Sequence, residues 1–251
     1  MASYHTRSLS FPSKSHPVAD QVEQQLCRVR SSQAASTSSL TNKLTDLNDL
    51  YKCVDEFLQL PVNQKTQSGS WVDEVLDGSL RLLDVCSTSR DVLAQSKEML
   101  QEIQSVLRRR CSSELNISNH VSEYLKARKT IKKVIQKCSK GIREVVKTNE
   151  ANPIEATLKD VQAITVDIFK SLFSYIGGSQ KSSWTFSKFV RGQKSEKETA
   201  AISELDAIDA TVDMSQLVKL ESNIEKIDRV LECLFRHLVK TRATLLNILS
   251  N

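Results

Sequence analysis

The sequence is poor in the residues that interrupt helices and in those that build sheets. Its 251 residues contain six glycines and four prolines, and aromatic residues make up only 5% of the chain. No stretch alternates strictly between polar and apolar residues, which is the pattern of a half-buried strand. The composition therefore argues against a sheet and favours long helices, in a chain long enough to bury one good-sized core.

Cysteine spacing argues against a metal centre and against a disulfide scaffold. The six cysteines form no Cys-x-x-Cys pair and are spread over the whole chain. Cys86 and Cys138 fall on the apolar faces of expected helices. We therefore predict that they are buried, reduced thiols in a cytosolic or nuclear protein.

Long apolar runs are also absent. No run approaches the roughly 20 residues that cross a bilayer, and the nearest candidate, residues 164–176, is interrupted by Asp167 and Lys170. The N-terminus lacks the apolar core of a secretory signal, although residues 1–19 contain no acid and several serines, as organelle transit peptides do. We predict a cytoplasmic protein, with a nuclear or a membrane-peripheral location as alternatives.

The strongest pattern in the sequence is a heptad seam near its C-terminal end. Between Ser215 and Leu249, apolar residues recur at alternating steps of three and four, with Thr241 as the one polar member. This spacing predicts a long amphipathic helix that needs apolar partners. Val230, Phe235 and Leu249 widen the stripe, which suits a bundle better than a two-stranded coiled coil. The seam consists of Leu217, Leu220, Ile224, Ile227, Leu231, Leu234, Leu238, Thr241, Leu245 and Ile248.

Shorter versions of the same pattern predict the remaining helices. The expected fold is an all-α bundle of about five or six mostly long amphipathic helices, forming a single domain over residues 17–251. A flexible, basic, Ser-rich tail at 1–16 precedes the domain, and a mobile loop is expected at 179–199. Residues 71–110 read as one helix or two nearly collinear ones with a kink near Ser87, and Pro61 opens a loop at 61–69. The other expected helices cover residues 17–30, 40–58, 118–149, 154–176 and 202–212.

The N-terminal tail contains a candidate phosphorylation-dependent docking motif. Arg7, Ser8, Ser10 and Pro12 match the Arg-Ser-x-Ser-x-Pro pattern that 14-3-3 proteins recognise when the second serine is phosphorylated. A phosphate on Ser10 would add nearly two negative charges for an arginine cluster to bind. The alternative is an unmodified basic tail.

Basic charge is concentrated on one expected helix. From Arg108 to Lys147 there are twelve Lys and Arg against three Glu, a balance of +9, so the rest of the +5 chain sums to −4. Such a localised field attracts an acidic protein, an anionic membrane surface or, less well supported here, nucleic acid. The alternative is a solvated outer face of a bundle helix. The basic face consists of Lys126, Lys129, Lys133, Lys137, Lys140 and Lys147.

Several ordered motifs resemble one known family. The text LDGSLRLLDVC at 76–86, followed by Arg90-Asp91 and by three arginines at 108–110, is similar to the central signature of the plant-specific BYPASS (BPS) family, first catalogued as a domain of unknown function. Further matching pieces lie at 5–8, 15–17, 58–61, 171–176, 183–188 and 245–249, so the similarity covers nearly the whole chain. The structural signature is carried by Trp71, Gly78, Leu82, Leu83, Asp84, Cys86 and Asp91.

The resemblance implies a helical protein with no established catalytic activity. One member of the family is linked to root and shoot development through control of a mobile root-derived signal. The resemblance therefore favours a non-enzymatic regulatory or adaptor protein. A peripheral membrane protein that binds anionic lipid through the basic face is the alternative, and a cryptic enzyme has the least support.

The residues themselves show no catalytic constellation. His120 and His237 are far apart and have no diagnostic neighbours, so we predict no catalytic residue, cofactor, metal or small-molecule substrate. Asp84 and Asp91 are expected to form local ion pairs. Arg81, Asp84 and Arg90 are alternatively expected to form a polar layer that sets the helix register.

Overall fold

The computed structural model describes residues 16–34, 40–64, 70–109, 114–142, 153–177 and 214–250, and within these ranges every regular element is a helix. The predicted all-α fold is thus confirmed. The N-terminal docking motif, Lys147, the expected loop at 179–199 and the expected helix at 202–212 lie outside the described residues. The helices are α1 (Pro17–Ala34), α2 (Leu40–Leu58), α3 (Pro61–Gln64), α4 (Ser70–Arg108), α5 (Glu114–Ile142), α6 (Pro153–Gly177) and α9 (Met214–Ser250).

Proline opens three of these helices, as its fixed φ and missing N–H allow at the first helical position. At Pro61 this changes a prediction, because residues 61–64 form the short helix α3 and not a loop. The Asn63 side-chain amide donates a hydrogen bond of 2.6 Å to the carbonyl of Phe57, and its backbone N–H donates to Leu60 at 2.9 Å. These two bonds hold α3 against the end of α2.

α4 is one continuous helix of 39 residues, which is the first of the two predicted alternatives. The small polar residues after Ser87 fit this helix. The hydroxyl of Ser89, for example, donates to the carbonyl of Val85 at 2.7 Å. α5 begins at Glu114, so Ser118 lies within its first turns and does not cap it. An acidic residue at the start of a helix is favoured by the helix dipole.

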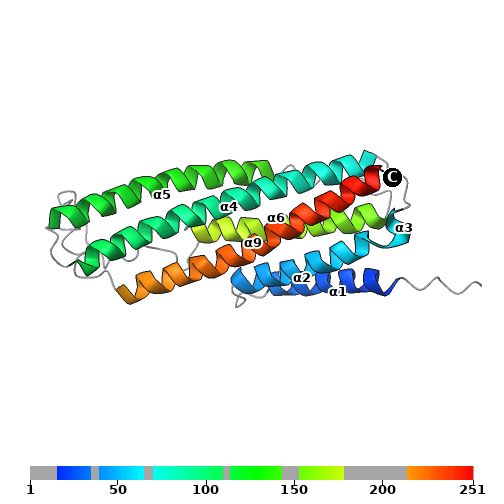
Figure 1. The fold of residues 1–251 in the computed structure, drawn as a ribbon, viewed down its shortest axis with the longest axis horizontal. Helices are drawn as coiled ribbons and strands as arrows, with labels where there is room; N and C mark the ends of the chain where they lie inside the picture. The colour runs from blue at the N-terminus through cyan, green and yellow to red at the C-terminus, as the bar shows by residue number, and fades with distance from the viewer. Residues whose placement is uncertain are drawn as a thin grey trace, which may run out of the picture.

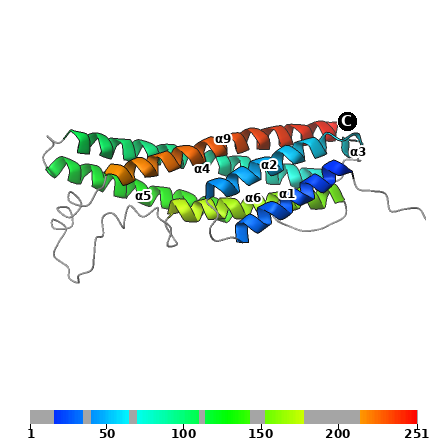
Figure 2. The same cartoon turned by 90° about the horizontal axis from the view of Figure 1, so that it is seen from below.

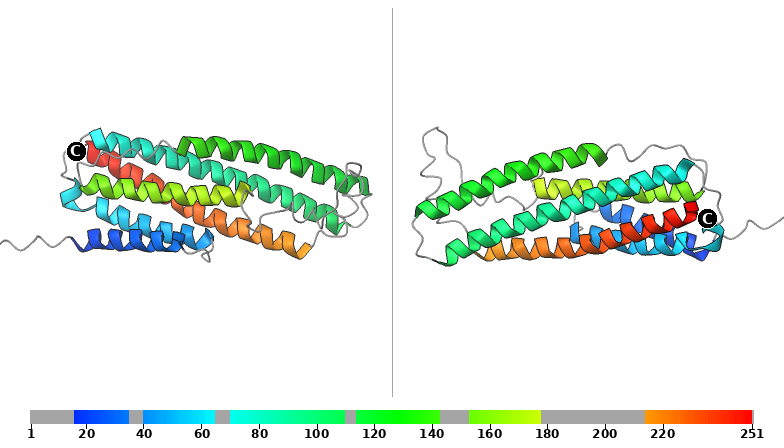
Figure 3. Two further views of the ribbon diagram at one scale, coloured as in Figure 1. Left: turned by 180° about the vertical axis from the view of Figure 1, so that it is seen from behind. Right: turned by 45° about the horizontal axis from the view of Figure 1, so that its top comes forward.

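The helices form an elongated bundle in which α9 lies along one face (Figure 1). α4 and α9 run antiparallel along most of the length of the molecule, and α9 packs most extensively against α4 and α2. α1 covers the outer side of α2, and α6 lies between the α1–α2 pair and α4 (Figure 2). α5 lies beside α4 at the edge of the bundle, on the half that α1 and α2 do not reach (Figure 3).

The inner face of α9 supplies the core that the heptad seam predicts. Nine of its ten members are buried and Leu220 is half-buried. Burial of one Leu or Ile contributes roughly 1.5 to 3 kcal/mol, so this face dominates the stability of the helix. Val230 and Phe235 pack against the core as expected, but Leu249 is 38% exposed, because no described helix covers that side of the C-terminal end of α9.

Candidate functional site

The basic face of α5 is the most extended one-sign surface that the sequence predicts. Ile131, Ile135 and Ile142 are buried on the inner side of the helix. Five predicted lysines, 126, 129, 133, 137 and 140, are exposed on its other sides, together with Lys132. Lys126, Lys133 and Lys140 are seven residues apart and so form one row along the helix.

These lysines have no carboxylate within 4.0 Å among the described residues. Within the described part of α5, the shortest distance between a basic nitrogen and a carboxylate is 3.9 Å, from His120 Nδ1 to Glu123. Elsewhere in the bundle, cations bind acids on neighbouring helices. Arg28 lies 2.9 Å from Asp46, and Arg30 lies 2.8 Å from Asp160. Arg28 and Arg30 are thus paired within the bundle, whereas the α5 lysines are free to bind an acidic partner.

A row of polar contacts joins one side of α4, from Arg90 to Gln104, to the acidic residues of α9. We call it the α4–α9 polar row. Arg90 Nε lies 3.1 Å from Asp228, and Lys97 Nζ lies 2.6 Å from Glu225. The hydrogen bond from Lys97 lowers the pKa of the Glu225 carboxyl, and the same bond raises the pKa of Lys97. Further along α4, the side-chain amide of Gln104 donates to Glu221 at 2.9 Å.

The α4–α9 polar row includes Arg90 but not Asp84, so the predicted polar layer around Asp84 is not formed. Arg90 binds α9 across the interface, whereas Asp84 is exposed. The expected local ion pairs are also not formed, since neither Asp84 nor Asp91 has a cationic partner within 4.0 Å among the described residues. The physical reason is that both residues point outward, away from the α9 acids that attract the cations of α4.

The other signature residues of α4 contribute to packing. Leu82 and Cys86 are fully buried, while Trp71 and Leu83 are half-buried against the core. Gly78 has a steric role, because a Cβ atom at this position would lie 2.5 Å from Oε1 of Gln162 on α6. A glycine here lets the buried Gln162 amide donate to the carbonyl of Val75 at 2.8 Å.

Cys86 is a buried thiol, as predicted, and it donates a weak hydrogen bond to the carbonyl of Leu231 at 3.5 Å. Burial raises the pKa of the Cys86 thiol from its ordinary 9.0 to about 12. Cys138 is a free thiol too, but it is only half-buried. Cys27 and Cys233 are exposed.

Two buried polar contacts tie α2 to the helices around it. The Tyr51 hydroxyl lies 3.1 Å from Oγ1 of Thr165 on α6, and burial raises the pKa of Tyr51 well above its ordinary value. Asp55, only 1% exposed, accepts a hydrogen bond of 2.7 Å from Thr241 and lies 3.1 Å from Nδ1 of His237, both on α9. A buried carboxylate needs such partners to offset its lost hydration.

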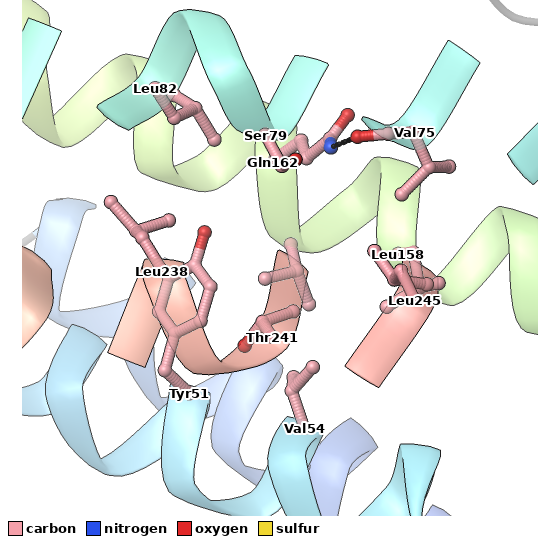
Figure 4. Close-up of a pocket in the computed structure, with 11 residues that line it drawn as sticks. Tyr51, Val54, Val75, Ser79, Leu82, Leu158, Gln162, Leu238, Thr241 and Leu245 are labelled. Atoms are coloured by element: carbon pink, nitrogen blue, oxygen red, sulfur yellow. Dashed lines mark hydrogen bonds between the residues drawn. The ribbon is translucent and has the colours of Figure 1, made fainter. Parts of the chain in front are cut away.

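A small cavity is lined by Tyr51 of α2 and Thr241 of α9, together with residues of α4 and α6 (Figure 4). Its volume is about 10 Å³, room for a single water at most. Tyr51, Ser79, Gln162 and Thr241 are among the residues that line it, but its wall is almost entirely apolar. The cavity is therefore too small and too apolar for a polar metabolite.

A larger hollow of about 260 Å³ lies between α4 and α5. Its wall includes Glu98, Glu102, Glu123 and His120, over Met99 and Ile103. These groups do not converge on a metal position, since no set of three or more His, Cys, Asp or Glu within the described ranges is arranged to hold an ion. None of the described helices has an apolar stretch long enough to span a bilayer.

Sequence reasoning missed the buried polar contacts because they depend on pairing between distant helices. Asp55 lies 186 residues from Thr241, and Gln162 lies 87 residues from Val75. One signal was present, since a lone threonine within an apolar seam indicates a polar partner opposite it. The partner itself becomes visible only once α2 is placed beside α9.

The comparison with protein families agrees with the motifs on α4. A family model described as Protein BPS1 matches residues 43–248. No curated protein and no solved structure matches the chain. The family match runs from α2 to the last turn of α9 and includes the whole signature from Trp71 to Asp91. The chain therefore belongs to the Protein BPS1 family, as the motifs in its sequence indicate.

Proposed function

We propose that the chain is a non-enzymatic regulatory or adaptor protein that acts in the cytoplasm through the outer surface of its helical bundle. Membership of the BPS family supports a role in root and shoot development, through control of a mobile root-derived signal. The observation that carries the proposal is the exposed basic face of α5, whose lysines have no acidic partner among the described residues. By contrast, buried polar groups such as Asp55 and Gln162 are bound to neighbouring helices.

Proximity labelling in root cells tests whether this surface selects the neighbours of the protein. The test variant carries Lys133→Glu and Lys140→Glu on α5, and the matched control carries Lys219→Glu and Lys226→Glu on α9. Both pairs are exposed lysines seven residues apart, so the two variants have the same net charge. We expect the α5 variant to lose neighbours that the control keeps. Identical labelling by the two variants would contradict the proposal.

A second candidate function is peripheral binding to an anionic membrane, because α5 presents a continuous row of cations. Lys140 lies fourteen residues after Lys126, so the row extends along about 21 Å of helix. A basic residue held close to an anionic bilayer contributes roughly 1 kcal/mol to binding. Several lysines on one face therefore suffice for a reversible, salt-sensitive attachment.

Vesicle flotation distinguishes this second function from protein binding. The full chain is mixed with phosphatidylcholine vesicles, with or without phosphatidylserine, at low and at physiological salt. Binding is expected only to the anionic vesicles, and the Lys133→Glu, Lys140→Glu variant should bind at least about tenfold more weakly, given the contribution of each charge. If the α9 control loses binding equally, or if neutral vesicles bind as well, the attachment does not use the α5 face.

A third element of the proposal concerns the N-terminal motif, which lies outside the described residues. Phosphorylation of Ser10 would let Arg7 and Pro12 present a phosphoserine to a 14-3-3 protein. Binding of a 14-3-3 protein to the phosphorylated chain is expected to disappear in a Ser10→Ala variant treated with the same kinase. Equal binding by both proteins would remove this partner from the proposal.

A further inference from the structure

Four of the five large apolar side chains that are exposed in the described part of the chain gather on one seam, and the fifth, Val218, lies elsewhere on α9. Leu80 on α4 is 45% exposed, and Val239, Leu246 and Leu249 on α9 are 45%, 42% and 38% exposed. Val239 and Leu246 continue at seven-residue intervals the row of Glu225 and Glu232, which interacts with Lys97 and Arg90 of α4. The rim of the α4–α9 interface is therefore polar along one half and apolar along the other.

The printed contacts fix which residues of the two helices lie at the same level. Arg90 lies 3.1 Å from Asp228, and Nη1 of Arg242 lies 3.2 Å from the Ser79 hydroxyl. Since the helices are antiparallel, Leu80 lies level with Val239. We call Leu80, Val239, Leu246 and Leu249 the outer strip. Each of its members is at least 38% exposed, so no described helix covers it.

Beyond the Leu80–Val239 end of the outer strip, the two helices carry opposite charges on their exposed sides. On the α4 side, Asp84 and Asp91 are exposed. On the α9 side, Arg229 and Arg236 are exposed over 75% and 73% of their side chains, and each is paired only with the glutamate one turn before it. By the same register, Asp84 lies level with Arg236, and Asp91 lies level with Arg229.

We propose that the outer strip is a self-association surface on which two copies of this chain pack about a two-fold axis parallel to the bundle. This symmetry places α4 of one chain over α9 of the other at the same level. Leu80 then meets Val239 of the second copy, while the Asp84 and Asp91 carboxylates meet the Arg236 and Arg229 guanidiniums. A surface that complements itself in both charge and hydrophobicity is what an isologous dimer requires.

The alternative two-fold axis, perpendicular to the helices, is disfavoured by the same charges. It would place α4 over α4 and bring the carboxylates of the two chains together, which is repulsive. The strip also has a limited size, because α9 runs only about 15 Å from Val239 to Leu249. An interface of this length belongs to the small, reversible class, so dissociation is expected in the micromolar range.

Sedimentation equilibrium of the full chain, from about 1 to 200 µM, tests the proposal across the concentrations at which small interfaces dissociate. The wild type is expected to shift from monomer to dimer within this range. Leu80→Glu should raise the dimer dissociation constant at least about tenfold, because a buried unpaired charge is costly at an interface. Val218→Glu is the matched control, since Val218 is also 45% exposed but lies three heptads from Val239 on the same row of α9. A wild type that stays monomeric, or a Val218→Glu chain that dissociates as readily as Leu80→Glu, would overturn the proposal.

Charge exchange between chains tests the axis directly and does not depend on any single variant. Asp84→Arg and Arg236→Asp are each expected to be monomeric, because each homodimer would bring like charges together. An equimolar mixture of the two should form a heterodimer, since both of its contacts then pair opposite charges. Circular dichroism of each variant confirms that it is folded. A mixture that behaves as the sum of its components would overturn the two-fold arrangement.

Discussion

The hydroxyl of Thr241 donates a hydrogen bond of 2.7 Å to the carboxylate of Asp55, in the buried interface between α9 and α2. Thr241 is the one polar member of the α9 seam, and Asp55 is 1% exposed. Thr241→Val keeps the shape of the side chain but removes the donor. We expect a loss of about 1 to 3 kcal/mol in the free energy of unfolding, because a buried charged acceptor loses a partner.

The control for this substitution is Thr244→Val, one turn further along the same helix. The Thr244 hydroxyl donates to the backbone carbonyl of Lys240 at 3.1 Å, in an exposed setting. Its loss should change the free energy of unfolding by no more than about 0.5 kcal/mol. Urea denaturation of both variants gives the comparison, and equal midpoints would show that the Asp55 contact does not stabilise the bundle.

Gly78→Ala is expected to destabilise the protein even though alanine is the better helix former. The new Cβ would approach Gln162 Oε1 to 2.5 Å and force the amide away from the Val75 carbonyl. Loss of this buried hydrogen bond, at about 1 to 3 kcal/mol, outweighs the gain of up to about 1 kcal/mol from helix propensity. Thermal unfolding should therefore occur at a lower temperature than in the wild type.

Gly141→Ala provides the matched control, because a Cβ at that position would meet nothing within 4 Å. It should leave the melting temperature unchanged or raise it. In a Gln162→Ala background, the penalty of Gly78→Ala should shrink, since the clashing amide is gone. A Gly78→Ala chain that melts with or above Gly141→Ala would refute the steric role of Gly78.

Cys86 predicts how stability changes at alkaline pH. Because burial raises its pKa from 9.0 to about 12, the unfolded thiol ionises first as the pH rises. The unfolded state then binds fewer protons than the folded state, so the free energy of unfolding falls above about pH 9, by up to roughly 1.4 kcal/mol per pH unit. Tyr51 acts in the same direction, since burial raises its pKa too.

Urea denaturation at several pH values between about 8 and 11, across the ionisation range of free thiols, measures this slope. Cys86→Ala should make the slope shallower, whereas Cys233→Ala should not, because Cys233 is exposed. If both variants kept the wild-type slope, the alkaline loss of stability would have another origin.

The sequence predicted most of the helices because their periodicity is local. The α9 seam and the bounds of α2 depend only on neighbours within a few turns, and the structure has both. The short helix α3 and the start of α5 differ from the prediction, since α3 is held to the end of α2 by an Asn63 contact that no pattern specifies.

Contacts between helices were much harder to predict. A polar layer around Arg90 is predicted from the sequence, but its partner, Asp228 on α9, lies 138 residues away and no local pattern identifies it. Exposure of the α5 lysines followed from helix periodicity, because the apolar residues fixed the inner face. Whether those lysines would find carboxylates on adjacent helices depended on the arrangement of the bundle, which sequence spacing alone does not determine.

The two sides of α9 have different roles. Its inner face holds the bundle together, and its outer face is open to partners. Leu231 is fully buried, whereas Val218 is 45% exposed on the same helix. Thermal unfolding of Leu231→Glu and Val218→Glu, followed by circular dichroism at low protein concentration, compares the two faces directly. We predict that Leu231→Glu loses its cooperative transition, since an unpaired buried charge costs more than about 4 kcal/mol, and that Val218→Glu melts within a few degrees of the wild type. Equal melting temperatures for the two variants would contradict the account.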